Sequence, residues 1–169
     1  GSLPALFNSL TSSWQEVLSI YQVEIDRIES HLRPGTYNPE GNVFAALRVN
    51  PDQISVVLIG QDPYPQEGVA DGVAFSCGAT GKIEASLRYI FDSIYKTTGV
   101  KTMDPDLGRW SDQGVLLLNS AFTTTIGKPG SHQLLWSPFI VAVLDALVWN
   151  KQNLVYVFMG KQAAKLADL

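Results

Sequence analysis

Hydrophobic and polar residues along the chain form two recurring patterns. The first is a short, continuous apolar run, which occurs within segments 54–59, 115–118 and 154–159. Such runs are typical of strands that are buried on both faces of a sheet. A glycine or a polar residue follows each run directly, namely Gly60, Asn119 and Gly160.

The second pattern is helical periodicity between these strands. Apolar residues recur on one helical face across 13–32, where Ser13 and Glu16 also have the spacing of a capping box. His31, in the last turn of this helix, is interpreted as structural. Further helices are predicted at 43–48, 83–98, 106–113, 136–148 and 161–169. Pro138 falls in the first turn of its predicted helix, where proline is tolerated.

The alternation of helices and strands predicts the fold class. Continuously apolar strands separated by helices indicate an α/β protein with three layers, α/β/α, around a short central parallel sheet. Right-handed crossovers bring the carboxyl ends of parallel strands to one edge of the sheet. Asp62, Asn119 and Gly160 are therefore expected to share one crevice, the usual place for a ligand in such folds.

Composition is consistent with one packed domain over residues 1–169. Hydrophobic residues make up 46% of the chain and charged residues 17%, which excludes a disordered or fibrous protein. No apolar run approaches the roughly 20 residues of a membrane span, so no membrane partner is expected. The net charge of −4 argues mildly against nucleic acid as a partner.

The single cysteine and the motif content limit the chemistry. Cys77 alone cannot form an intramolecular disulfide, which favours a reducing compartment. The expected location is the cytoplasm, or the nucleus in a eukaryotic or viral setting. No residues have metal-ligand spacing, and no Gly-x-Gly-x-x-Gly motif follows a strand, so no metal or cofactor is expected.

The segment after the first strand carries the candidate chemistry. It reads Gly60-Gln61-Asp62-Pro63-Tyr64-Pro65. Each proline disfavours the helical conformation in the residue before it, so Asp62 and Tyr64 are held on extended backbone just beyond a strand end. From these residues alone, a solvated turn aspartate and a functional site are about equally good interpretations.

A longer set of motifs resembles the uracil-DNA glycosylase family. The six-residue segment is followed by Phe75-Ser76, by Trp110-x-x-x-Gly114 with Leu116-Leu117-Leu118-Asn119, and by Ser131-His132 and Trp136. The resemblance runs from about Trp14 to the end of the chain. It implies an enzyme of base-excision repair that flips uracil out of DNA and hydrolyses its N-glycosidic bond, releasing free uracil and an abasic site.

The resemblance also implies a role for individual residues. Asp62 would position the attacking water and stabilise positive charge on the sugar. Asn119 would read uracil through its amide, Phe75 would stack on the base, and Gln61 would offer a main-chain amide. Tyr64 would fill the space of the thymine methyl group, because the methyl alone is worth only about 1–3 kcal/mol of binding. A core aromatic remains an alternative for Phe75, and a loop cap for Asn119.

Contacts to the DNA backbone are implied for three further residues. Ser86 and Ser131 resemble the hydroxyls that bind phosphates beside the lesion, and His132 would assist them. For either serine a helix cap is an equally good interpretation. Glu84 lies where the family is usually proline-rich, and its charge weakens the phosphate assignment of Ser86.

Two features of the family do not occur in this sequence. A fourth strand and a His-Pro-Ser loop with a leucine wedge would follow, but the sequence ends at Leu169 without them. We therefore expect a C-terminally incomplete domain with feeble or absent activity, because a positioned acid or donor typically contributes 10²–10⁴ in rate. The segment 154–159 is expected to be a bare edge strand.

The expected partners are uracil-containing DNA, free uracil as product and a proteinaceous glycosylase inhibitor, and the expected state is a monomer. Two other functions stay open. One is a glycosylase-like protein that only binds DNA or a partner such as a polymerase accessory factor. The other is a hydrolase acting on a different nucleoside.

Overall fold

The computed structural model describes residues 2–168, apart from the side chain of Gln162. Its α-helices are α1 (Leu3–Asn8), α2 (Ser12–Leu18), α3 (Gln22–Ser30), α4 (Ala85–Thr98), α5 (Gly108–Ser111), α6 (Gln133–Asn150) and α7 (Lys161–Ala164). Its strands are β1 (Tyr37–Asn38), β2 (Val56–Gly60), β3 (Val115–Asn119), β4 (Thr124–Thr125) and β5 (Val155–Phe158). Short 3₁₀ helices are η1 (Ser19–Tyr21), η2 (Ala45–Arg48), η3 (Pro51–Gln53) and η4 (Lys165–Asp168).

The central sheet has three parallel strands in the order β3-β2-β5. The three predicted strands are therefore confirmed, with bounds that shift by one or two residues. In the register of β2 and β3, Gly60 lies opposite Asn119. Both residues end their strands, so the carboxyl ends of β2 and β3 meet at one edge of the sheet as the topology predicted.

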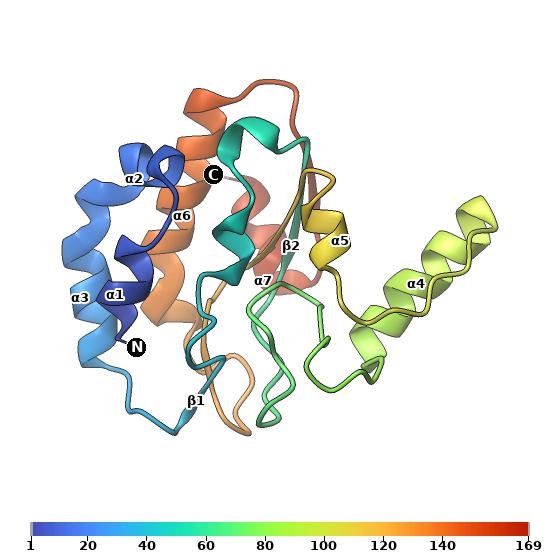
Figure 1. Ribbon diagram of the computed structural model, residues 1–169, viewed down its shortest axis with the longest axis horizontal. Helices are drawn as coiled ribbons and strands as arrows, with labels where there is room; N and C mark the ends of the chain where they lie inside the picture. The colour runs from blue at the N-terminus through green and yellow to red at the C-terminus, as the bar shows by residue number, and fades with distance from the viewer. Residues whose placement is uncertain (1, 169) are drawn as a thin grey trace.

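Side chains alternate between two cores, one on each face of the sheet. Val57 and Ile59 of β2 pack with Leu116 and Leu118 of β3 against helices α1, α2, α3 and α6. Leu117, on the other face, packs against the 69–77 loop and the first half of α4. Figure 1 shows α1, α2, α3 and α6 on one side of β2, with α5 and α4 on the other. The three-layer α/β/α prediction is thus correct.

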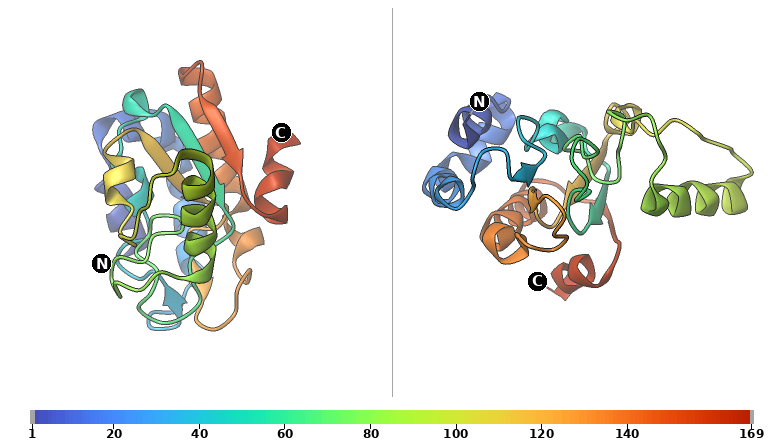
Figure 2. Two further views of the ribbon diagram at one scale, coloured as in Figure 1. Left: turned by 90° about the vertical axis from the view of Figure 1, so that its right-hand side faces the viewer. Right: turned by 90° about the horizontal axis from the view of Figure 1, so that it is seen from below.

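The two outer elements of this arrangement are only partly covered. Helix α4 buries Leu87 and Phe91 in its first half, while its second half extends away from the body of the molecule (Figure 2). Strand β5 pairs with β2 alone in the described sheet, and Val155 and Val157 remain 58% and 41% exposed. The apolar segment 154–159 therefore forms the edge that the sequence predicted.

The N-terminal helix differs from its prediction. The predicted helix over 13–32 is divided into α2, η1 and α3, with α1 preceding them. The capping-box prediction is wrong: α2 begins at Ser12 after Thr11, and no side-chain hydrogen bond caps it. The predicted apolar face is nevertheless buried, since tertiary packing rather than the cap orients these turns.

The helix around Pro138 also begins earlier than predicted. Because α6 starts at Gln133, Pro138 lies inside the helix rather than in its first turn. The proline lacks the N–H that would bind the carbonyl of Leu134, four residues before it. Leu134 is 91% exposed, so water can satisfy that carbonyl, which explains why the helix continues through the proline.

Helix α6 is also long and apolar enough to cross a membrane, which the sequence analysis did not anticipate. Its apolar residues have another explanation in this fold. Trp136, Phe139, Val143 and Leu147 are buried in the core against α3 and the sheet. Core packing accounts for the apolar residues between 136 and 147, whereas Leu134, Val148 and Trp149 remain exposed.

Candidate active site

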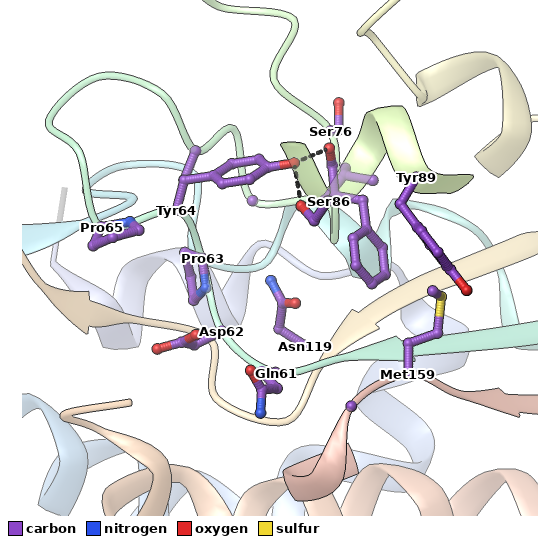
Figure 3. Close-up of a pocket in the computed structure, with 15 residues that line it drawn as sticks. Gln61, Asp62, Pro63, Tyr64, Pro65, Ser76, Ser86, Tyr89, Asn119 and Met159 are labelled. Atoms are coloured by element: carbon purple, nitrogen blue, oxygen red, sulfur yellow. Dashed lines mark hydrogen bonds between the residues drawn. The ribbon is translucent and has the colours of Figure 1, made fainter. Parts of the chain in front are cut away.

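A cavity of about 430 Å³ opens at the carboxyl ends of β2 and β3 (Figure 3). Six of the predicted site residues line it: Gln61, Asp62, Tyr64, Phe75, Ser86 and Asn119. They come from the end of β2, the 69–77 loop, the start of α4 and the end of β3. The fold therefore brings together residues that lie up to 58 positions apart in the sequence, between Gln61 and Asn119.

Asn119 is the most informative residue of this cavity. Its side chain is only 9% exposed and lines the cavity, and Figure 3 shows its amide among the other lining residues. Within residues 2–168 neither atom of this amide has a hydrogen-bond partner, and neither is among the fully enclosed side-chain atoms that lack one, which are Glu29 Oε2 and Asn50 Oδ1. The amide therefore faces the cavity, where its donor and acceptor are available to a ligand.

Gly60 allows the ring of Phe75 to approach this amide. A Cβ atom added at Gly60 would lie 2.9 Å from Oδ1 of Asn119 and 2.9 Å from Cζ of Phe75. Real Cβ atoms do not approach other atoms so closely. The glycine at the end of β2 is therefore required by space, and it keeps the amide and the ring on the same small region of the cavity wall.

Phe75 has an unusual backbone conformation, with φ at 67°. Such a conformation costs a non-glycine residue about 1–3 kcal/mol and persists only where neighbouring contacts enforce it. One such contact comes from Tyr64, whose hydroxyl donates to the carbonyl oxygen of Phe75 at 2.7 Å. The same hydroxyl lies 3.1 Å from Oγ of Ser86.

Burial raises the pKa of the Tyr64 phenol well above its ordinary value. Its hydrogen bond with Ser86 partly opposes this shift. Because the phenol keeps its proton throughout the neutral range, it remains a hydrogen-bond donor to Phe75. The two aromatic residues predicted to contact the base are therefore linked directly.

Asp62 lies half-buried in the segment between β2 and Pro63. Its Oδ2 accepts a hydrogen bond from the backbone N–H of Gly130. Its Oδ1 has no hydrogen-bond partner within residues 2–168. One oxygen is thus fixed by the 126–132 loop, and the other is available for a water molecule or a ligand.

The backbone of Gln61 is held firmly, whereas its side chain is exposed. Its carbonyl oxygen accepts from Ala121 N at 3.0 Å, from Ser120 Oγ at 2.7 Å and from Gln133 Nε2 at 2.7 Å. Three donors on one carbonyl fix the orientation of the peptide plane between Gln61 and Asp62. This contact positions the start of the Asp62 segment.

Ser131 and His132 do not line the cavity, in contrast to the other six predicted residues. Oγ of Ser131 accepts from the backbone N–H of Thr125 at 2.9 Å. Nδ1 of His132 lies 2.8 Å from Oγ1 of Thr123, and its Nε2 lies 3.0 Å from Oγ1 of Thr125. Both side chains therefore stabilise the 126–132 loop, which places Gly130 beside Asp62.

Burial lowers the pKa of His132, while the nearby carboxylate of Asp62 raises it and partly offsets the effect. The lowered pKa favours the neutral imidazole. A neutral ring can accept a hydrogen bond at one nitrogen and donate at the other, and a threonine hydroxyl can serve as partner in either role.

Sequence reasoning missed two residues that shape the cavity. Nδ2 of Asn38, on β1, donates to the carbonyl oxygens of Tyr64 at 3.2 Å and Gln66 at 2.9 Å. Asp71 accepts three hydrogen bonds within the loop that carries Phe75. The Asp71-Gly72 pair is a turn signal that could have drawn attention to it. Nothing in the sequence near Asn38 indicates its role, because its partners are 26 and 28 residues away.

No group of three or more His, Cys, Asp or Glu side chains in the described part of the chain could hold a metal ion. The cavity lining is mostly apolar, with the polar atoms of Asp62, Asn119 and the hydroxyls as exceptions. An aromatic ring beside an unpaired amide suits a flat heterocycle with donors and acceptors on its edge. The fold and the site thus define the class of nucleobase-binding α/β proteins.

Comparison with known proteins narrows this class to one family. Residues 48–168 match the Uracil DNA glycosylase superfamily. The chain is 35% identical to a uracil-DNA glycosylase of Chlamydia abortus over 171 residues, covering 96% of this chain and 75% of the relative. A uracil-DNA glycosylase of Acinetobacter baumannii is 39% identical over 132 residues, 76% of this chain and 56% of the relative. This chain belongs to the uracil-DNA glycosylase family.

Solved structures give the same result for the fold. The crystal structure of mimivirus uracil-DNA glycosylase superposes with a TM-score of 0.86 at 28% identity, covering 96% of this chain and 65% of that one. A Y322L variant of the mimivirus enzyme, in complex with the inhibitor UGI, gives a TM-score of 0.83 at 27% identity. The family resemblance inferred from the motifs is confirmed.

Proposed function

We propose that this protein binds a uracil nucleotide extruded from DNA and hydrolyses its N-glycosidic bond in base-excision repair. The proposal depends above all on the amide of Asn119, which faces the cavity and has no hydrogen-bond partner within residues 2–168. Its carbonyl can accept from N3–H of uracil while its NH₂ donates to O4, and cytosine presents the opposite pattern on these atoms. Rejecting cytosine is essential for an enzyme that acts on normal DNA.

Asp62 is the proposed catalytic residue. Hydrolysis adds the hydroxyl of water to C1′ of the sugar, and uracil leaves with the bonding electron pair and later gains the proton. The hydrogen bond from Gly130 fixes one oxygen of Asp62, so that the other can orient the water. The negative charge of the carboxylate also stabilises the positive charge that develops on the sugar.

Phe75 and Tyr64 are the proposed base-recognition rings. The Phe75 ring beside Asn119 would stack on the flat base, and the Tyr64 ring would occupy the space of the thymine methyl group. Steric exclusion is needed because a methyl-sized difference in binding gives only about 10–200-fold discrimination. Gln61 completes the proposed uracil contacts through its main-chain amide.

Ser86, Ser131 and His132 are the proposed contacts to the DNA backbone. Ser86 supports this role by its position in the first turn of α4 at the cavity, where a helix N-terminus favours anions. Ser131 and His132 belong to the loop that contacts Asp62, so a phosphate bound there would lie beside the reacting sugar. Backbone contacts of this kind position DNA without reading its sequence.

Binding without efficient turnover is a second candidate function. None of the residues that line the cavity is His, Lys or Arg, so negative charge on departing uracil would be stabilised by neutral donors alone. The two histidines, His31 and His132, hydrogen-bond to Arg27 O and to threonines instead. A missing positioned donor reduces rate by about 10²–10⁴, whereas it affects binding less.

The proposal extends to partners and location. Uracil-containing DNA is the substrate and free uracil the product. A proteinaceous glycosylase inhibitor is a further partner, by analogy with the mimivirus enzyme bound to UGI. We propose a monomer in a reducing compartment, the cytoplasm or a nucleus, where the buried thiol of Cys77 would stay reduced.

Uracil release from a single-stranded oligonucleotide tests the proposal. We expect the wild-type chain to release uracil, although slowly, and Asn119→Ala to release about tenfold less, since leaving polar groups of the base without partners costs about 1–3 kcal/mol. Asn8→Ala, an exposed change on α1, is the matched control. Tight binding without release would favour the second candidate, and neither binding nor release would exclude both.

A further inference from the structure

The carboxylate of Asp71 organises the loop that carries Phe75. Its Oδ1 accepts from the backbone N–H of Val73 at 3.1 Å. Its Oδ2 accepts from Oγ of Ser76 at 2.5 Å and from the backbone N–H of Gly78 at 3.2 Å. These partners lie on both sides of Phe75 in the sequence, so one side chain closes the loop around the ring-bearing residue.

Ser76 extends this network to a second segment. Its side chain is 1% exposed, and its Oγ accepts from the backbone N–H of Leu107 at 3.1 Å while it donates to Asp71. The neighbouring Cys77 N–H donates to the carbonyl oxygen of Pro105 at 3.0 Å. The loop is thereby attached to residues 105–107, which lead into α5 and β3.

Phe75 requires such support because its φ of 67° is rare for a residue with a side chain. Tyr64 holds the carbonyl oxygen of Phe75 from the cavity side. Asp71 holds the chain before and after Phe75, through Val73, Ser76 and Gly78. Together these contacts define where the Phe75 ring lies relative to Asn119.

We infer that Asp71 is a positioning residue for uracil binding, acting through Ser76 and the loop backbone on the ring of Phe75. The inference rests on the proposed function, in which that ring stacks on the base. Asp71 itself does not line the cavity. Its negative charge strengthens the hydrogen bonds that it accepts, as is general for ionised acceptors.

Asp71→Asn tests the inference with little change in shape. The amide oxygen can still accept from Val73 N–H, but the NH₂ group cannot accept from Ser76 or Gly78. Ser76→Ala removes the hydrogen bond between Ser76 and Asp71 by deleting its donor. Asp26→Asn is the matched control, because Oδ1 of the exposed Asp26 accepts from Nε2 of Gln22 at 3.2 Å on α3, away from the cavity.

Kinetics of uracil release provide the first measurement. In Asp71→Asn and in Ser76→Ala we expect KM to rise about tenfold and kcat to change less, since the loop affects base stacking and not Asp62. In the double variant, KM should rise about as much as in the more affected single variant, because both changes break the same hydrogen-bond network. Asp26→Asn should match the wild type. An unchanged KM in an active Asp71→Asn variant overturns the inference.

Amide hydrogen exchange provides a measurement that does not depend on activity. We expect faster exchange across residues 72–79 in Asp71→Asn, with the strands β2 and β3 protected as in the wild type. Unchanged exchange in this loop overturns the positioning role. A wild-type chain that neither binds nor releases uracil overturns the proposed function instead, and with it the ligand named in this inference.

Discussion

The hydroxyl of Tyr64 donates to the carbonyl oxygen of Phe75, and this 2.7 Å hydrogen bond connects two roles that the family resemblance assigns separately. Tyr64 would exclude thymine, and Phe75 would stack on uracil. Because one phenol contacts the backbone of the other ring residue, a change at Tyr64 is expected to alter affinity as well as specificity.

Two substitutions at Tyr64 separate these effects. Tyr64→Ala should admit thymine and also raise KM for uracil, because both the ring and the hydrogen bond are lost. Tyr64→Phe should still reject thymine, but it should lower the free energy of unfolding by about 1 kcal/mol through the lost hydrogen bond. Excision from matched uracil- and thymine-containing oligonucleotides and thermal unfolding measure both outcomes. Continued rejection of thymine by Tyr64→Ala would remove this residue from the specificity argument.

Asp62→Asn should abolish most turnover while leaving binding intact. The amide oxygen can still accept from Gly130 N–H, so the loop geometry is preserved. The loss of negative charge should reduce kcat by about 10²–10⁴, the usual contribution of a positioned acid or base. Single-turnover release and oligonucleotide binding measure the two quantities, with Asp52→Asn, an exposed change, as control. A rate equal to that of the wild type would refute the assigned role.

Gly60→Ala should impair uracil binding by steric conflict alone. The added methyl group would lie 2.9 Å from Asn119 Oδ1 and from Phe75 Cζ, so one of these groups must move. Overpacking of this kind typically costs about 1–3 kcal/mol, and a cost of that size in uracil binding corresponds to about a fivefold to 150-fold loss in kcat/KM. Gly108→Ala is the control, because its Cβ would meet only Oδ1 of Asp106 at 3.2 Å. Full activity in Gly60→Ala would show that the cavity wall has more room than this geometry allows.

His132 should make the folded state sensitive to mild acid. Burial lowers its pKa below the ordinary value of 6.5, so the unfolded chain binds this proton more tightly than the folded chain. The stabilisation is therefore fully present above about pH 6.5 and is lost as the pH falls through the lower folded-state pKa. His132→Gln should flatten this part of the stability curve, measured by thermal unfolding between about pH 5 and pH 7.5. An equal pH dependence in both proteins would show that other groups cause it.

Much of the fold could be predicted because its pattern is local. Continuous apolar runs identified all three strands of the central sheet, and glycines or polar residues marked their ends. The divided N-terminal helix and the start of α6 were predicted less well. Helix ends depend on packing and on solvent access to single carbonyl groups, as at Leu134, which sequence periodicity does not encode.

The site was only partly predictable, because residues at strand ends follow a general rule and residues in loops do not. Asp62, Tyr64 and Asn119 stand next to strand ends, where the rule for parallel sheets indicates ligand contact. The resemblance grouped Ser131 and His132 with these residues. In the structure both belong to the 126–132 loop and do not line the cavity. Their role in phosphate binding stays a prediction.

By itself the sequence determined the α/β class, the parallel sheet and the family, because apolar periodicity and short motifs are properties of neighbouring residues. Only the tertiary structure decided that the Asn119 amide faces the cavity, that Gly60 makes room for Phe75, and that Asp71 closes the Phe75 loop. These relationships depend on distances between segments far apart in the chain. Such distances arise from packing, and no local pattern of residues contains them.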